Sequence, residues 1–324
     1  MRGFALANAL ALIVAVAWLA WLTLPTAQAV RVRNAFLMRR GRLEDFNWTP
    51  STAPEDFKAE RRQPPSVIAT AVEASGVAEA ANDWQRARGL VEMLVRHAEH
   101  EGGIRADLAA TFTGIVAGYG YCADYVRVYM AAACGIGLFC RQWAFSFDGF
   151  GGHGHTFVEI YDRQRDAWAF LDVHNNVYAV QPGTEAPLDA LALRHALLHA
   201  PASIEFRQAA SGRLGFPHVE KLRDYYQRGA NEWYLWWGNN VVTREQGWLV
   251  RAAGTISGQL SHLTANVLGA LPWLVVLATP DNERAIARME ALRRQVFAAA
   301  LVCIALVATL LVQLGWTAFV RRDG

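Results

Sequence analysis

Two long apolar runs, one near each end of the chain, constrain the fold more than any other feature of this 324-residue sequence. Residues 4–24 carry no charge and are long enough to cross the hydrocarbon core of a bilayer, which takes about 20 residues in a helix. Residues 296–320 are also uncharged, carry Trp316 and Phe319 near their end, and stop at Arg321 and Arg322, as a spanning helix does. We therefore predict an integral protein of the cell membrane, whose middle part folds outside the bilayer.

The N-terminal run has a second interpretation. Ala27-Gln28-Ala29 resembles a signal-peptide cleavage site, although the apolar core of a signal peptide is usually shorter, about 7 to 15 residues. An uncleaved anchor over residues 1–30 is therefore preferred to a cleaved signal. A third apolar stretch, residues 263–279, contains Pro272 and could form a buried helix, a re-entrant helix or a weak span. The side of the membrane that carries the middle of the chain depends on these alternatives and stays undetermined.

Charge and cysteine usage exclude several classes of partner. Lys and Arg number 31 against 29 Asp and Glu. This near balance argues against nucleic-acid binding, which favours a strongly basic protein. The four cysteines form no CxxC pair and no zinc-ligand spacing, so neither a metal nor another cofactor is predicted. A bridge between Cys134 and Cys140 stays open.

The flanks of the middle part are assigned by composition. Residues 31–82 are predicted to be a linker, because mixed charges alternate with four prolines, Pro50, Pro54, Pro64 and Pro65. Residues 183–255 are predicted to be a mainly helical extension. It holds a dense aromatic patch, Trp233, Tyr234, Trp236, Trp237 and Trp248. Residues 256–324 are the predicted C-terminal membrane region, with the span at 296–320.

Between the flanks, helical patterns precede strand patterns. A helix is predicted from Asn82, which has capping-box spacing to Gln85, and a second helix is predicted to begin at Cys122 after a glycine turn. Strands are then predicted over 138–147, 155–161 and 167–173, the last two joined as a hairpin. Helices followed by an antiparallel sheet predict an α+β fold.

Three residues in this region have the types and positions of a thiol-dependent catalytic site. A free thiol is mostly protonated at neutral pH, and the unpaired N–H groups at a helix start favour the thiolate of Cys122. A nearby histidine can complete an ion pair and later protonate a leaving amine, and a carboxylate behind it fixes its orientation. His155 opens one predicted strand, and Asp172 lies near the end of the strand hairpinned to it.

The same stretches resemble the core of the transglutaminase-like superfamily. The resemblance rests on residues 120–125, 133–137, 154–161 and 168–172, and it covers residues 83–182, about a third of the chain. It implies a papain-like fold, in which a catalytic helix packs on an antiparallel sheet, here with transmembrane helices at the termini. It also implies that Cys122 is the nucleophile, His155 the base and Asp172 the orienting acid. The sequence departs from many members at Gly137, where they carry proline.

Several alternatives accompany these assignments. His153 lies two residues before His155, but the position directly before Thr-Phe-Val-Glu favours His155 as the base, and His153 is a weak candidate for substrate binding. Tyr119 is a second weak candidate, because the oxyanion-hole side chain of the family lies upstream of the cysteine. Either Asp148 or Asp162 could replace Asp172 as the acid, and a metal site could use Cys122, His153, His155 and His174, although their spacing does not indicate one.

The predicted activity is acyl transfer from a protein or peptide amide through a thioester, resolved by water or by an amine. This description includes transglutaminases, thiol proteases and amidases, and the resemblance does not identify the acyl acceptor. The first alternative is a binding or scaffold protein that kept the fold and lost catalysis. The second is an acyltransferase similar to arylamine acetyltransferases, which would need an acyl-CoA donor.

Overall fold

The computed structural model describes residues 2–23, 26–96, 102–104, 106–212, 215–216, 218–245, 269 and 271–322. The chain forms two compact units. The helical unit comprises residues 1–36, 149–152 and 283–324, and the sheet unit comprises residues 37–148 and 153–282.

The helical unit contains α1 (Arg2–Thr23), most of α2 (Thr26–Leu37) and the long helix α12 (Glu283–Arg322). Phe4–Thr23 and Glu283–Thr317 are long and apolar enough to cross a membrane, as predicted, by length and composition alone. Their large apolar side chains are mostly exposed, which suits contact with lipid. Asn8 Nδ2 donates a hydrogen bond of 3.2 Å to the carbonyl of Leu306 and thereby links α1 to α12. Helix α12 is longer than the span predicted over residues 296–320.

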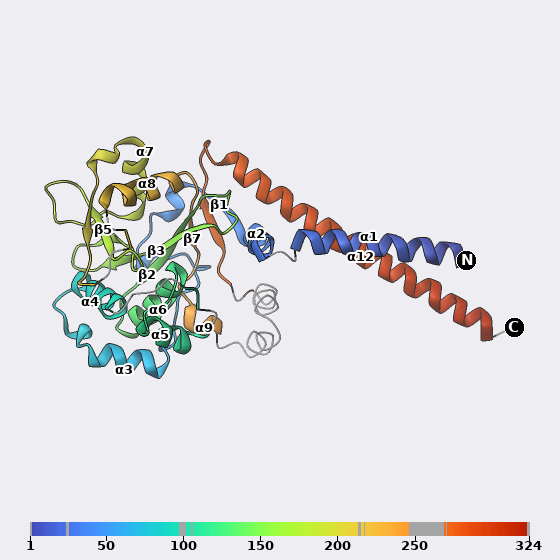
Figure 1. Ribbon diagram of the computed structural model, residues 1–324, viewed down its shortest axis with the longest axis horizontal. Helices are drawn as coiled ribbons and strands as arrows, with labels where there is room; N and C mark the ends of the chain where they lie inside the picture. Colours follow the sequence, from blue (N-terminus) through green and yellow to red (C-terminus); the bar gives the residue numbers. More distant parts are fainter. Residues whose placement is uncertain are drawn as a thin grey trace. The chain divides into compact units, whose positions relative to one another are not determined.

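The sheet unit is built on a six-stranded sheet with the order β1-β8-β7-β2-β3-β4 (Figure 1). Its strands are β1 (Met38–Gly41), β2 (Cys140–Ser146), β3 (Gly154–Asp162), β4 (Ala167–Leu171), β7 (Trp233–Trp236) and β8 (Leu274–Leu277). All neighbours pair antiparallel except β1 and β8, which pair parallel. The α+β class is therefore confirmed, whereas the sheet is mixed rather than purely antiparallel.

Helices cover both faces of this sheet. One face carries α3 (Ser66–Ala74), α4 (Asp83–Val95), α5 (Leu108–Val116), α6 (Cys122–Gly135) and α9 (Val241–Glu245). The other carries α7 (Ala190–His199) and α8 (Val219–Gly229), seen on the opposite side of the strands in Figure 1. A small second sheet pairs β5 (Val177–Val180) with β6 (Glu205–Gln208). Short 3₁₀ turns occupy Leu43–Phe46, Pro50–Thr52, Val77–Glu79 and Pro201–Ser203.

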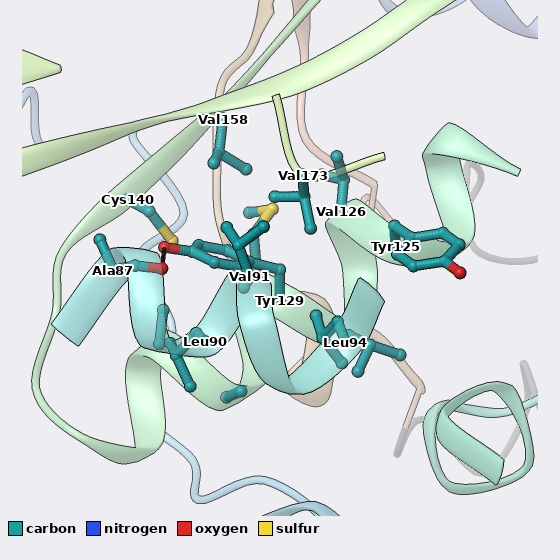
Figure 2. Close-up of a cluster of buried hydrophobic side chains, with 14 of the residues drawn as sticks. Ala87, Leu90, Val91, Leu94, Tyr125, Val126, Tyr129, Cys140, Val158 and Val173 are labelled. Carbon is teal, nitrogen blue, oxygen red and sulfur yellow. Dashed lines mark hydrogen bonds between the residues drawn. The ribbon is translucent and has the colours of Figure 1, made fainter. Parts of the chain in front are cut away.

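Alternating side chains of β3 divide between two cores. Val158 and Ile160 pack with the helices around α6, whereas Phe157 packs with α7 and α8. In the first core, Leu90, Val91 and Leu94 of α4 surround Tyr129 of α6 (Figure 2). The Tyr129 hydroxyl donates a 3.1 Å hydrogen bond to the carbonyl of Ala87 (Figure 2). Burial raises the pKa of Tyr129, so this hydroxyl stays a donor.

Replacing Tyr129 with phenylalanine tests this buried hydrogen bond. We expect a loss of about 1 kcal/mol, because the ring stays packed and only the hydroxyl is removed. For a domain of this size that corresponds to a Tm lower by about 2–4 °C. Thermal unfolding of the full chain in detergent measures it. Tyr121→Phe is the control, since Tyr121 is 52% exposed, and an equal effect of both substitutions would contradict the interpretation.

Residues 31–82, predicted to be a linker, are folded. They contain most of α2, all of β1 and all of α3, and the aromatic side chains of Phe46, Trp48 and Phe57 are buried in the second core. Trp48 and Phe57 lie with ring centroids 4.8 Å apart. The prolines therefore belong to a packed segment. Burial of its aromatic side chains stabilises this segment, and an exposed linker would lack that stabilisation.

Two C-terminal expectations also differ from the structure. Within the extension predicted to be mainly helical, Trp233–Trp236 form strand β7 in the middle of the sheet, while Trp248 lies outside the described residues. Leu274–Leu277 form the buried strand β8, so the helical alternatives for 263–279 do not hold for these residues. Residues 263–268 lie outside the described part of the chain.

Candidate active site

The start of α6 places Cys122 at the first turn of a helix, as predicted. Tyr121 is the N-cap residue, and the Asp124 carboxylate accepts hydrogen bonds from the backbone N–H groups of Tyr121 at 3.0 Å and Ile104 at 3.1 Å. Gly120 has φ +127°, a conformation that side chains disfavour, and an added Cβ would lie 3.0 Å from the Tyr125 ring. Glycine, cap and carboxylate together fix the helix start, where Cys122 is partly exposed.

His155 and Asp172 meet at the end of the sheet where β3 begins and β4 ends. Phe157 would lie opposite Asp172 in the antiparallel register, so His155 is its diagonal neighbour on the same face. His155 Nε2 lies 2.7 Å from Asp172 Oδ2, and both side chains are buried. A Cβ added at Gly154 would lie 1.8 Å from the Phe145 carbonyl oxygen, so this close approach of β3 to β2 requires glycine directly before the histidine.

The Asp172 carboxylate is surrounded by donors. Asn175 Nδ2 donates to Oδ2 at 2.6 Å, and the Asn175 backbone N–H donates to Oδ1 at 3.1 Å. The hydroxyl of Tyr226, on α8, also donates to Oδ2. Burial alone would raise the pKa of Asp172, but the charge of His155 and these hydrogen bonds hold it below the usual value. Asp172 is therefore an ionised acceptor in the interior of the sheet unit.

His155 joins the carboxylate to the thiol. Burial alone would lower the pKa of His155. The charge of Asp172, together with the charge of Cys122 and a hydrogen bond to it, outweighs burial and raises that pKa to about 10. The structure thus brings Cys122, His155 and Asp172 together in space, in the order thiol, imidazole, carboxylate. In such an arrangement the imidazole can exchange a proton with the thiol and so activate it as a nucleophile.

The raised pKa of His155 predicts a pH dependence of stability. A histidine whose pKa rises from about 6.5 in the unfolded chain to about 10 when folded stabilises the fold fully below pH 6.5. That contribution is lost as the pH rises through 10. We expect the Tm of the wild type, relative to that of His155→Gln, to fall between pH 6.5 and 10. A constant difference across this range, measured by thermal unfolding in detergent, would contradict the assignment.

The two weak candidates, Tyr119 and His153, are more exposed than Cys122, His155 and Asp172. Tyr119 is 46% exposed, and His153 is exposed with its ring centroid 5.6 Å from that of Phe147. The alternative acids make other contacts: Asp148 accepts a hydrogen bond from Ser146 Oγ, and Asp162 accepts one from the Gln164 backbone.

The metal-site alternative concerns Cys122, His153, His155 and His174. The His174 ring lies 6.2 Å from that of His155 and 5.4 Å from that of Tyr125. Within the part of the chain that the structure describes, no three His, Cys, Asp or Glu side chains gather as metal ligands would.

Three residues at the site were missed by sequence reasoning. Asn175 lies in the turn after β4, and the run Asp-Val-His-Asn-Asn from 172 to 176 is a turn signal that points to it. Tyr225 and Tyr226 lie on α8, more than 50 residues beyond Asp172. Leu222 and Tyr226 are spaced i, i+4 on one helical face, which indicates burial but not what the face covers.

Comparisons with known proteins found no matching family model, no matching curated protein and no matching solved structure.

Proposed function

We propose that this chain is a membrane-anchored, cysteine-dependent enzyme of the transglutaminase-like type, which transfers the acyl group of protein or peptide amides through a thioester. The observation that carries the proposal is the convergence of Cys122, His155 and Asp172, although 50 residues separate the first from the last. The two apolar terminal helices are compatible with the anchor. Protein or peptide substrates and the lipid bilayer are the expected partners.

The geometry suggests how the residues divide the work. Nε2 of His155 faces Asp172, which leaves Nδ1 for Cys122. The Cys122 thiolate attacks the amide carbonyl carbon, and the imidazolium of His155 protonates the nitrogen as the C–N bond breaks. Water or an amine then attacks the thioester, with the neutral imidazole as base, and restores the thiolate. Asp172 orients the imidazole throughout and stays ionised.

Mass spectrometry of reacted peptides tests the proposal. A glutamine-containing peptide pool is incubated with the full chain in detergent, with and without a primary amine. We expect a deamidated glutamine, a bond cleaved by water or an amine adduct, in each case with wild type and not with Cys122→Ala. Cys134→Ala is the matched control, because Cys134 is also partly exposed and lies at the other end of α6. Identical products from wild type and Cys122→Ala would refute the proposal.

Selective alkylation separates an enzyme from an inactive scaffold. Burial and the nearby Glu60 raise the pKa of Cys134, and burial raises that of Cys140, so both stay thiols near neutral pH. We expect iodoacetamide at pH 7 to modify Cys122 before either of them, and His155→Gln to slow that modification. Equal rates at Cys122 and Cys134, resolved by peptide mapping over time, would instead support a scaffold that kept only the fold.

A further inference from the structure

Helix α8 contributes two consecutive tyrosines to the candidate site. Both rings lie beside His155, but their hydroxyls differ in what they contact. Tyr226 is buried, and its hydroxyl donates to Asp172. Tyr225 is only partly buried, and its ring centroid lies 5.5 Å from that of His155 in an edge-to-face arrangement at 73°. The contact of Tyr226 with Asp172 therefore anchors α8 at the carboxylate and sets Tyr225 against the imidazole.

Aromatic neighbours fix the Tyr225 ring. Ring centroids of Phe216, Phe147 and Phe145 lie 5.0, 5.2 and 5.6 Å from that of Tyr225. Such pairs favour a single orientation of the ring. Among the residues that the structure describes, the Tyr225 hydroxyl has no hydrogen-bond partner, in contrast to Tyr226 beside it.

The charges around Tyr225 keep its hydroxyl protonated. Burial, followed by the nearby Cys122 and Asp172, raises the pKa of Tyr225 well above its usual value, and Arg228 only partly opposes them. The same imidazole contacts both residues: His155 packs against the Tyr225 ring and hydrogen-bonds Cys122. At neutral pH the Tyr225 hydroxyl is a neutral donor on a ring that packs against His155, and no other described residue engages it.

We propose that the hydroxyl of Tyr225 binds the acyl oxygen of the substrate during attack by Cys122. As the Cys122 sulfur bonds to the carbonyl carbon, the π electrons of the carbonyl move onto its oxygen, and the Tyr225 O–H donates a hydrogen bond to that oxyanion. The oxyanion then reforms the carbonyl as the bond to the leaving group breaks, and His155 supplies the proton that an amine leaving group needs. Tyr225 donates a hydrogen bond and keeps its own proton. This role rests on the proposed function.

Tyr119 is the rival donor, because it lies upstream of the cysteine. It is 46% exposed, whereas the Tyr225 ring packs against His155. A second rival role is that Tyr225 only shields His155 from solvent, for which the ring would suffice without its hydroxyl. The two tyrosines and the two roles can be separated with phenylalanine substitutions.

The test compares two reactions of the same sulfur. Acylation of Cys122 by p-nitrophenyl acetate passes through an oxyanion, whereas alkylation by iodoacetamide displaces iodide and forms none. In the full chain in detergent, we expect Tyr225→Phe to slow acylation about 10²-fold and to leave alkylation unchanged. Tyr119→Phe tests the rival donor: slowed acylation in Tyr119→Phe, with wild-type acylation in Tyr225→Phe, would assign the role to Tyr119 instead.

The outcomes are distinct. A wild-type rate of acylation in Tyr225→Phe would overturn the donor role and favour the shielding role. Equal slowing of acylation and alkylation would also overturn the donor role, because the substitution would then act through the structure of the site. Either result leaves the proposed function standing if peptide turnover still depends on Cys122. Failure of the proposed function has a different signature, which is acylation and turnover in the wild type no faster than in Cys122→Ala, and that result would remove the role of Tyr225 as well.

Discussion

Replacing Asp172 with asparagine is expected to lower the Cys122-dependent turnover about 10⁴-fold. The carboxylate accepts hydrogen bonds from four donors: His155, the side chain and backbone of Asn175, and Tyr226. An asparagine has one acceptor oxygen and one donor amide, so at least one of these contacts becomes donor against donor. The imidazole then loses both its orienting acceptor and the negative charge that stabilises its protonated form.

The measurement is the initial rate of product formation by Asp172→Asn in the peptide assay, together with its Tm. The matched control is Asp162→Asn, because Asp162 is also a buried carboxylate of the same sheet but lies at the opposite end of β3. We expect that control to keep its turnover. A folded Asp172→Asn protein with wild-type turnover would exclude Asp172 as the orienting acid and would weaken the whole arrangement.

The central part of this site could be predicted because its signals are local. Cys122 follows a glycine turn and opens an apolar helical pattern, and α6 begins there. The period of two in strands places His155 and Asp172 on one face once the hairpin between β3 and β4 is recognised, and the observed register agrees. Each step needs only residues within about one hairpin of each other.

The rest of the fold and of the site depends on long-range pairing, which local sequence patterns do not encode. Strand β1 pairs with β8, whose residues lie 236 positions further along the chain, as Met38 opposite Leu274 shows. The run Trp233–Trp236 is apolar throughout, so its periodicity cannot distinguish a buried strand from a helix. Tyr225 and Tyr226 reach the site only because α8 packs on the face that carries His155 and Asp172. The helical pattern predicts that such a face is buried, but not which side chains it meets.

Replacing Arg141 with methionine is expected to destabilise the sheet unit by about 3–5 kcal/mol. Arg141 on β2 lies opposite Glu159 on β3, with Nε and Oε2 2.6 Å apart, and their side chains are 2% and 0% exposed. The guanidinium also lies 4.0 Å from the centre of the Trp168 ring and donates to the carbonyl of Phe46 at 2.8 Å. Removing the guanidinium leaves the buried Glu159 carboxylate without its partner. The cost of that charge exceeds the loss of the stacking contacts.

A double-mutant cycle distinguishes the stranded charge from simple loss of packing. Glu159 also accepts hydrogen bonds from Trp143 Nε1 and the Ala190 backbone, and a glutamine at 159 keeps an acceptor for one of them without carrying a charge. We therefore expect the double variant Arg141→Met, Glu159→Gln to be more stable than Arg141→Met alone. Arg42→Met, which breaks an ion pair whose arginine is 81% exposed, should change the stability by at most about 1 kcal/mol. If the effects of the substitutions at 141 and 159 on Tm were additive, the stranded charge would not be the cause of the destabilisation. The cost of Arg141→Met would then be assigned to the loss of its aromatic contacts.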